Sequence, residues 1–370
     1  MVHLRSLFQE KKMNDVERRC RKAYEKYGVS SVIWNVTSQC DLNCKHCYIG
    51  DEVDTSQELD EDEAQELISQ LGEIGVPLLF LTGGEPLFRE DIFDILKSCQ
   101  ENNITTVLSS NGLLLNREKV NGLKRYGVHF NAVSIYGPPK VHDEVVGRPG
   151  SFNKIMQGVK NCIENDIQVC FKTVVSNYTY EHLPYIIEKG SQMGVKAFYL
   201  CDLIDTGRAQ GYDLWRITTE QWRELSEFLF QKVIMGGEAE LDIGACPSIG
   251  PLAIEYFREQ NYNVEHALER LNSMSACPVG QGYISINASG DVLPCNFMQD
   301  YSLGNIRDKP LPELAQKPLM ESLACQKDLK GRCKDCKYKH LCGGCRAKAY
   351  VKTGDITQED HTCIIEFTQD

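Results

Sequence analysis

The sequence predicts an α/β fold in which a partial, TIM-like (β/α)6 barrel is followed by a cysteine-rich domain. Strand-like and helix-like segments alternate six times between residues 31 and 211. This alternation stops near Tyr212, and helical patterns follow. The cysteines gather in two regions, one after the first predicted strand and one from Cys277 onward. Alternating strands and helices are typical of a parallel sheet with right-handed crossovers, which supports the barrel prediction.

Short apolar runs bounded by turn residues predict the strands, and apolar residues at helical spacing predict the helices. The predicted strands are Val32–Val36, Pro77–Thr82, Thr105–Ser109, Asn131–Tyr136, Val169–Val175 and Ala197–Leu203. The predicted helices between them are Glu58–Ile74, Glu90–Gln100, Arg117–Arg125, Phe152–Asn165 and Tyr180–Met193. Reactive groups of such folds collect at the C-terminal ends of the strands. The polar residues that fall there are Cys40, Gly83–Pro86, Asn111 and Asp202.

Changes in composition divide the chain into four parts. Residues 1–30 predict a charged, solvent-exposed helical extension, and residues 31–211 predict the barrel. Residues 212–270 predict a helical bridge, with helices near Thr219–Val233 and Leu252–Gln260. Residues 271–370 form the cysteine-rich domain.

Composition also limits the classes of function. The net charge of −12, from 40 basic and 52 acidic residues, argues against nonspecific nucleic-acid binding, which needs a basic surface. No apolar run approaches the roughly 20 residues of a membrane span, and the charged N-terminus has no signal-peptide core. We therefore expect a cytoplasmic protein. In that reducing compartment disulfides do not explain 17 cysteines, so metal ligation is the leading explanation.

The first cysteine region is the loop Cys40-x3-Cys44-x2-Cys47. Three thiolates at this spacing suit three irons of a 4Fe-4S cubane and leave the fourth iron open to a small ligand. A structural zinc site is the alternative, but zinc then usually takes four protein ligands. The one nearby candidate, His46, is crowded between its neighbours. The loop therefore favours an iron-sulfur cluster.

This cysteine triad after the first strand resembles the signature of the radical S-adenosylmethionine (SAM) superfamily, and further motifs match in order. The segment Leu81-Thr-Gly-Gly-Glu-Pro86 is similar to the family's motif for the methionine amine of SAM, and glycine lets a backbone approach a ligand closely. The SAM contacts that the resemblance implies are Gly83, Gly84, Glu85, Ser109, Asn111 and Ser134.

The strand Val169–Val175 adds a further SAM-contact candidate on physical grounds. Cys170, Lys172 and Val174 share one face of it, so a lysine stands in an otherwise apolar strand. A charge in that position needs a partner. A carboxylate of SAM or of a substrate would serve, and a structural ion pair is the alternative.

The second cysteine region resembles the SPASM (twitch-like) extension of radical SAM enzymes, which carries auxiliary 4Fe-4S clusters. The resemblance implies one cluster on Cys333, Cys336, Cys342 and Cys363, and a second on Cys277, Cys295 and Cys345. The final pair, Cys342-Gly-Gly-Cys345, is one residue shorter than in many relatives. The second cluster lacks an obvious fourth ligand. Cys246 or Cys325 could supply this ligand, or the fourth iron could be open. Alternatively, a single auxiliary cluster could form. Paired cysteines are also typical of a zinc ribbon, which is the alternative kind of site.

Other stretches are similar to the enzymes of alternative haem and haem d1 synthesis. They are Trp34–Thr37, Asp205–Arg208, Gly331–Cys336 and Cys342–Asp355. The haem synthase that oxidatively decarboxylates two propionates of iron-coproporphyrin III to vinyls is the preferred match. The alternatives are the acetate-removing iron-coproporphyrin III synthase, a peptide-modifying SPASM maturase and, in another class, a zinc-binding scaffold.

The resemblance also implies the partners. A low-potential donor would reduce the first cluster, and the resulting 5'-deoxyadenosyl radical would abstract a hydrogen from the propionate β-carbon of the iron-porphyrin substrate. Cations that could bind substrate carboxylates are Arg148, Lys172, Arg208 and Arg346. Histidines that could contact the iron are His129, His142 and His340. No catalytic residue is assigned from the sequence.

Overall fold

The computed structural model describes residues 1–9, 14–51, 54–211, 213–273, 277–324 and 327–366. Within them one sheet of eleven strands has the order β1-β8-β7-β6-β5-β4-β3-β2-β9-β10-β11. The strands are β1 (Val2–His3), β2 (Val29–Thr37), β3 (Leu78–Gly83), β4 (Thr105–Ser110), β5 (Phe130–Ser134), β6 (Gln168–Val175), β7 (Ala197–Asp202), β8 (Glu240–Gly244), β9 (Gly282–Ile286), β10 (Asp291–Leu293) and β11 (Gly304–Asn305).

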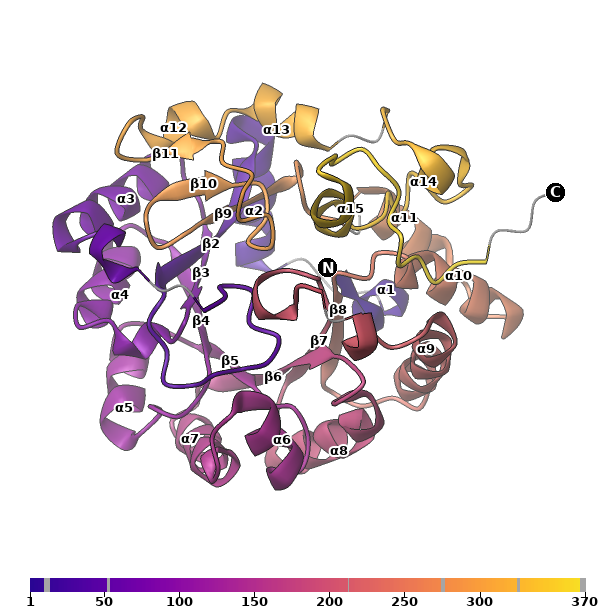
Figure 1. The fold of residues 1–370 in the computed structure, drawn as a ribbon, viewed down its shortest axis with the longest axis horizontal. Helices are drawn as coiled ribbons and strands as arrows, with labels where there is room; N and C mark the ends of the chain where they lie inside the picture. The colour runs from indigo at the N-terminus through magenta and orange to yellow at the C-terminus, as the bar shows by residue number, and fades with distance from the viewer. Residues whose placement is uncertain (10–13, 52–53, 212, 274–276, 325–326, 367–370) are drawn as a thin grey trace.

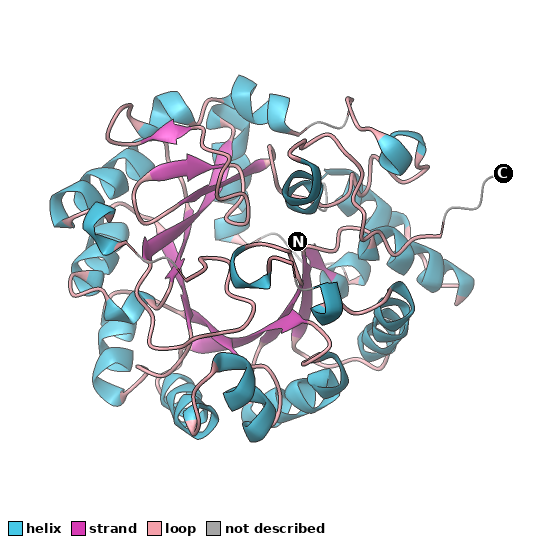
Figure 2. Cartoon of the chain, in the orientation of Figure 1, coloured by secondary structure: helices cyan, strands magenta, loops and turns pink. Residues whose placement is uncertain are grey.

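Strands β2 to β7 are parallel neighbours in chain order, which confirms the predicted partial barrel. The helices that accompany them are α1 (Leu4–Phe8), α2 (Asp15–Tyr27), α3 (Glu61–Glu73), α4 (Ile92–Glu101), α5 (Arg117–Arg125), α6 (Pro139–Val146), α7 (Ser151–Glu164) and α8 (Leu183–Met193). The later helices are α9 (Thr219–Ile234), α10 (Ile249–Glu259), α11 (Glu265–Ser273), α12 (Leu311–Leu314), α13 (Lys317–Leu323), α14 (Gly331–Asp335) and α15 (Arg346–Thr353). The sheet curves without closing, and most helices lie outside it (Figures 1 and 2).

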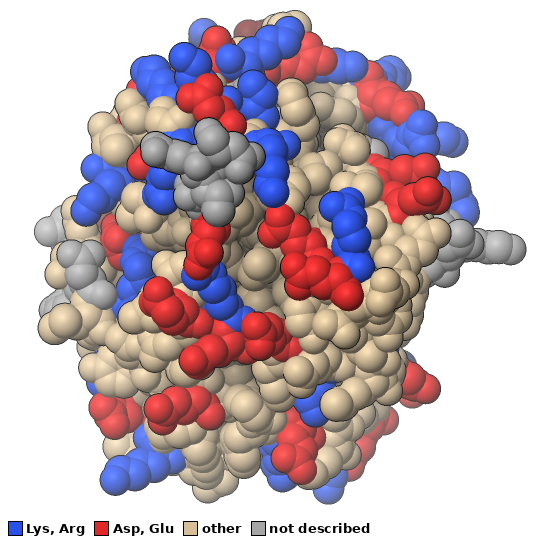
Figure 3. All heavy atoms as spheres, turned by 90° about the vertical axis from the view of Figure 1, so that its right-hand side faces the viewer, with Lys and Arg blue, Asp and Glu red and all other residues tan. Residues whose placement is uncertain are grey.

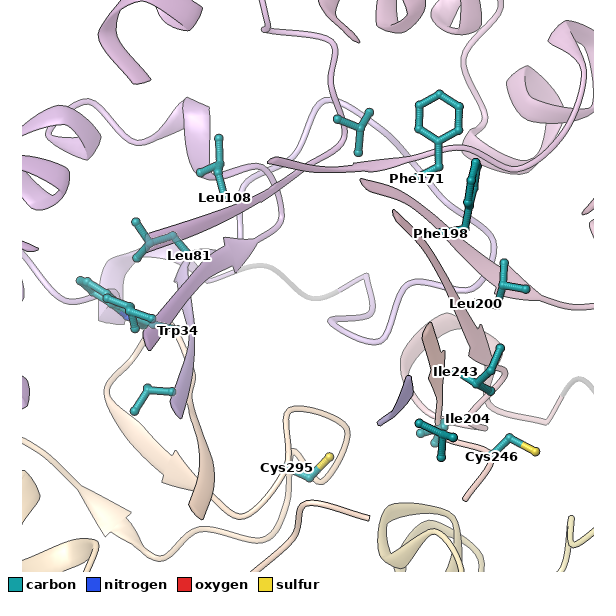
Figure 4. Close-up of a cluster of buried hydrophobic side chains, with 14 of the residues drawn as sticks. Trp34, Leu81, Leu108, Phe171, Phe198, Leu200, Ile204, Ile243, Cys246 and Cys295 are labelled. Atoms are coloured by element: carbon teal, nitrogen blue, oxygen red, sulfur yellow. The ribbon is translucent and has the colours of Figure 1, made fainter. Parts of the chain in front are cut away.

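The two faces of the curved sheet differ in chemistry. Trp34, Leu81, Phe171 and Phe198 point outward (Figure 4) and are buried. A Cβ on Gly190 of α8 would touch the rings of Phe198 and Phe171, so this helix packs directly on the outer face. Because side chains alternate along a strand, the residues between these point inward, toward the space enclosed by the curve.

The structure corrects the prediction of a purely helical bridge over residues 212–270. Glu240–Gly244 forms β8, which pairs in parallel with β7 and extends the barrel by one strand. The five residues Glu-Leu-Asp-Ile-Gly do alternate between polar and apolar, but they are too few to stand out beside the long helix α9. Pairing with an existing strand edge supplies the stability that this short segment lacks alone.

The N-terminal residues are likewise not a solvent-exposed extension throughout. Val2–His3 forms β1, which pairs antiparallel with β8, and Leu4 and Leu7 of α1 are buried. Among the described N-terminal residues, α2 carries the expected charged surface, with Ala23 as the one buried residue of this helix. The N-terminus consequently lies inside the curve of the sheet (Figure 1).

The cysteine-rich region is joined to the other edge of the barrel. Strand β9 pairs in parallel with β2, and β10 and β11 continue the sheet as an antiparallel ribbon. Helix α15 lies against β7 through an ion pair between Lys348 and Asp202, both 1% exposed. Asp202 also accepts a hydrogen bond from Trp222 Nε1 at 3.1 Å, and Lys348 donates to Thr362 Oγ1 at 2.8 Å. The C-terminal region therefore packs over the C-terminal ends of the parallel strands.

The described helices include none that is long and apolar enough to cross a membrane. On the face shown in Figure 3, basic and acidic side chains are interspersed. This mixture agrees with the net charge of −12.

Replacing Lys348 by Met should lower the free energy of unfolding by about 3–5 kcal/mol, because Asp202 would stay buried without its cation. The double variant Asp202→Leu/Lys348→Met should recover most of this loss, since an apolar pair removes both desolvated charges. Urea unfolding measures both effects. Lys196→Met is the matched control, because its pair with Glu238 is exposed and should contribute no more than about 1 kcal/mol. Equal losses in Lys348→Met and Lys196→Met would contradict the expectation.

Candidate functional site

The first cysteine loop begins at the end of β2 and rests on the backbone that follows β3. The N–H of Gly84 donates to the carbonyl of Thr37 at 2.8 Å, and the N–H of Glu85 donates to that of Gln39 at 2.7 Å. A Cβ at Gly83 would lie 2.2 Å from the Thr37 oxygen, and one at Gly84 would lie 2.1 Å from the Gln39 oxygen. The glycines are therefore required for contact between two protein backbones. The approach of this backbone to a ligand, expected from the sequence, stays a prediction.

Glu85 connects the ends of β3 and β4 from inside the protein. Its carboxylate is fully buried and accepts hydrogen bonds from the Asn111 N–H at 2.6 Å and the Ser110 hydroxyl at 2.9 and 3.0 Å. A further bond comes from the Leu87 N–H at 3.1 Å. Burial raises the pKa of Glu85 to about 7, although these donors act in the opposite direction. The side chain is thus a positioning group between two strand ends.

Asn111 carries this connection onward to the cysteine loop. Its Nδ2 donates to Asp41 Oδ1 at 2.8 Å and lies 3.6 Å from Cys40 Sγ. Arg148 donates to the other carboxylate oxygen of Asp41 at 2.9 Å and to the Asp41 carbonyl at 3.0 Å. The loop is therefore held by a residue that follows β4 and by one that follows α6.

The opposite side of the loop is fixed by main-chain contacts. The N–H groups of Asn43 and Lys45 donate at 3.0 Å to carbonyls at the end of α6. The Arg208 N–H donates to the Cys47 carbonyl at 2.9 Å, and a Cβ at Gly207 would lie 2.3 Å from that oxygen. The turn after β7 thus packs tightly against the last cysteine of the triad.

A cleft of about 460 Å³ opens between these segments. Its lining includes Cys40, Cys47, Gly84, Arg148 and Arg208. Arg148 and Arg208 also pair with Asp41 at 2.9 Å and Asp51 at 3.2 Å, so their charges are partly compensated. The structure thus brings the triad, the second glycine and two of the four candidate cations to one opening.

Lys172 lies on the inner face of β6, as the strand pattern predicts. Its ammonium group donates to the hydroxyl of Ser109 on β4 at 2.5 Å. Burial lowers the pKa of Lys172, and nearby thiols and Glu85 act in the opposite direction. Ser134 is the neighbour of Lys172 in the ladder between β5 and β6. Three of the predicted SAM contacts therefore meet inside the barrel.

The second cysteine region contains a cavity with four thiols in its wall. Cys333, Cys336, Cys342 and Cys363 all line it. Main-chain N–H groups already point at two of these sulfurs, from Tyr338 to Cys336 at 3.4 Å and from Gly344 to Cys342 at 3.3 Å. A Cβ at Gly344 would come within 3.2 Å of Cys333 Sγ. The structure thus gathers one predicted ligand set completely.

The remaining predicted ligands form a second, buried group. Burial raises the pKa of the Cys345 thiol, and the neighbouring Cys277 raises this pKa further. Burial also raises the pKa of Cys295 to about 12, with contributions from Cys277 and Cys201. Cys246 lies beside Asp202 and Lys348, and Lys348 is also a neighbour of Cys345. Cys325 lies outside the described residues. Among the described residues no three His, Cys, Asp or Glu side chains form a group that could hold a single metal ion.

Comparisons with known proteins agree with this geometry. Residues 34–189 match the model of the radical SAM superfamily, and residues 277–337 match that of the SPASM iron-sulfur cluster-binding domain. An AdoMet-dependent heme synthase from Methanosarcina barkeri (strain Fusaro / DSM 804) is 30% identical over 339 residues, which cover 90% of this chain and 95% of that protein. The chain belongs to the radical SAM superfamily.

Two further likenesses add detail to this radical SAM enzyme. The Fe-coproporphyrin III synthase of the same strain is 26% identical over 348 residues, covering 90% of this chain and 87% of that protein. The crystal structure of Streptococcus suis SuiB bound to S-adenosylmethionine has a TM-score of 0.71 at 18% identity, covering 94% of this chain and 81% of that one. That structural likeness confirms the fold. SAM and 4Fe-4S clusters are accordingly the cofactors of this radical SAM enzyme.

Some predicted substrate contacts are placed elsewhere. Arg346 is 2% exposed and donates to the carbonyls of Ile356 at 2.8 Å and Gln358 at 2.7 Å, so it holds the C-terminal loop together. His129 and His340 are exposed, the former before the start of β5, and His142 is buried beneath Tyr136. None of the three histidines lies in the inner layer of the sheet.

Sequence reasoning missed two groups of site residues. Asp41 joins Asn111 and Arg148, and its charged position within the cysteine loop was an available signal. His3 and Asp242 form an inward-facing pair at 2.5 Å. No local pattern could have revealed this pair, because the two residues are 239 positions apart.

Glu85 should make stability depend on pH. Because the folded-state pKa of about 7 exceeds the ordinary 4.5, the contribution of Glu85 is complete below pH 4.5 and is lost as the pH rises through 7. Between pH 5 and pH 8 the wild type should therefore lose up to about 3 kcal/mol relative to Glu85→Gln. Urea unfolding at several pH values measures this difference. Glu188→Gln on the exposed face of α8 is the control, and a pH-independent difference for Glu85→Gln would contradict the prediction.

Proposed function

We propose that this radical SAM enzyme is a haem synthase, which converts two propionates of iron-coproporphyrin III to vinyls by oxidative decarboxylation. The observation that carries the proposal is the similarity to the AdoMet-dependent heme synthase, which extends over 90% of this chain and includes both cysteine regions. A radical SAM maturase that acts on peptides would share the fold and both cysteine regions. The porphyrin substrate is therefore the part of the proposal that needs a direct test.

The residues fit a SAM-binding cluster on the first loop. Cys40, Cys44 and Cys47 would hold three irons, with the fourth iron open to SAM in the adjoining cleft. The exposure of Cys40 and the partial exposure of the other two thiols leave room for the cluster. His46, the candidate for completing a zinc site, packs against the Tyr136 ring with centroids 4.6 Å apart.

The SAM contacts proposed from the sequence divide into two roles. Gly84 lines the cleft, so the main chain of Gly83–Glu85 would face the methionine part of SAM. Ser109, Ser134 and Lys172 lie on the inner face, where the lysine would bind a carboxylate of SAM or of the substrate. The side chains of Glu85 and Asn111 instead position the loop through their bonds to protein groups.

The auxiliary ligands fit as two sets. Cys333, Cys336, Cys342 and Cys363 would hold one cluster in the cavity that they line. Cys277, Cys295 and Cys345 would hold the other. Outside this set, Cys201 is a thiol that also raises the pKa of Cys295.

When bound, SAM and the first cluster supply the hydrogen-abstracting 5'-deoxyadenosyl radical, and an auxiliary cluster supplies an acceptor for the electron that leaves with decarboxylation. The chain itself orients the reactants. The glycine contact and Glu85 fix the triad, and Lys172 would hold a carboxylate inside the barrel. The packing of α15 against the end of β7 would limit access of water to the radical from that side.

Iron analysis tests the assignment of the cysteines. After anaerobic reconstitution, Cys40→Ala/Cys44→Ala/Cys47→Ala should lose the iron of one cluster and abolish SAM cleavage, while the C-terminal clusters remain. The variant Cys333→Ala/Cys336→Ala should lose the iron of one auxiliary cluster and keep SAM binding. Cys99→Ala, a buried thiol on α4, is the control with full iron content. Zinc in place of iron in the wild type would overturn the assignment.

The substrate is tested by incubating the reconstituted enzyme with SAM and a low-potential reductant in two separate reactions, one with iron-coproporphyrin III and one with didecarboxysirohaem. Mass analysis should show two successive losses, each of one carbon dioxide and two hydrogens. A product that instead forms by acetate loss from didecarboxysirohaem would identify the activity of the Fe-coproporphyrin III synthase relative. Formation of 5'-deoxyadenosine with both porphyrins unchanged would overturn the tetrapyrrole proposal and favour a peptide substrate.

A further inference from the structure

The inner face of the sheet carries a histidine-carboxylate pair that the proposed function leaves unused. His3 of β1 lies opposite Asp242 of β8 in the ladder, and the His3 Nδ1 to Asp242 Oδ1 distance is 2.5 Å. Asp242 in turn lies beside Tyr199 of β7, and Tyr199 lies beside Lys172 of β6. Four neighbouring strands therefore place His3, Asp242, Tyr199 and Lys172 in one layer of side chains.

This layer faces the interior of the barrel. Phe171 and Phe198 touch α8 on the outer face, so the adjacent Lys172 and Tyr199 point inward. Asp242 shares the face of Tyr199 through the register. β1 is the edge strand of the sheet beside β8, and the side chain of His3 is 38% exposed, so the imidazole is accessible at that edge.

The pair leaves one ring nitrogen of His3 available. Asp242 accepts from Nδ1, and the hydrogen bonds among the described residues give Nε2 no partner. A histidine that binds a metal through one nitrogen commonly donates the other N–H to a carboxylate, which fixes the ring and increases its basicity. The geometry of His3 and Asp242 matches that arrangement.

The position also suits a large planar ligand. Lys172 and His3 are separated by three strand spacings, roughly 14 Å along the sheet at about 4.8 Å per strand. A cation for a carboxylate thus stands at one end of the layer and an imidazole at the other. Of the histidines predicted to contact the iron, His129 and His340 are exposed elsewhere and His142 is buried.

We propose that His3 binds the iron of the porphyrin substrate through Nε2, with Asp242 as the positioning residue that holds the imidazole. The inference rests on the proposed function, because the iron belongs to the substrate. It assigns to the N-terminal strand a direct part in the active site.

The test compares the binding of iron-coproporphyrin III and metal-free coproporphyrin III to the reconstituted enzyme without reductant. Soret absorption and electron paramagnetic resonance report the iron ligand. His3→Ala should weaken binding of the iron form on the order of 10- to 100-fold, change its Soret band and leave binding of the metal-free form unchanged. Asp242→Asn should weaken binding of the iron form by about tenfold. His129→Ala, at an exposed position before β5, is the control and should behave as the wild type.

Added imidazole should restore the wild-type spectrum of His3→Ala, because it can occupy the vacated ligand position. Equal weakening of both porphyrins in His3→Ala would show a purely structural pair and overturn the inference. An unchanged iron spectrum in His3→Ala would overturn it as well, while leaving the haem synthase proposal intact. Failure of the wild type to bind either porphyrin would overturn the proposed substrate and this inference with it.

Discussion

The contact between the backbones of Gly83–Gly84 and Thr37–Gln39 is the constraint on which the site depends. Neither glycine could carry a Cβ without meeting a carbonyl oxygen at little more than 2 Å. This contact fixes the cysteine loop at the edge of β3, and the buried Glu85 then connects that edge to Asn111 after β4. The loop is thereby set by groups with little freedom to move, which is what a catalytic constellation requires.

The arrangement of the C-terminal region follows from the two open edges of the barrel. Strand β9 extends one edge beside β2, while α15 is held to β7 near the other by Lys348 and Asp202. The second cysteine region is therefore hydrogen-bonded into the sheet on one side of the barrel and packed against the other side.

Much of the barrel could be predicted from local patterns. The six central strands and their helices are long enough, and apolar enough, for periodicity to define them. Strands β1 and β8 escaped prediction because they have two and five residues and are stabilised by pairing with edges formed far away in the chain. The same limit affected Arg346, whose charge predicted a surface or substrate contact but whose partners are carbonyls of the following loop.

The sequence by itself predicted the iron-sulfur ligands and indicated the radical SAM family, because the spacing of Cys40, Cys44 and Cys47 is a local property of one loop. It likewise indicated the glycine motif and the inward lysine of β6. Only the tertiary structure decided which side chains meet across the barrel. His3 and Asp242 adjoin through strand pairing over 239 positions, and their placement depends on the curvature and register of the whole sheet.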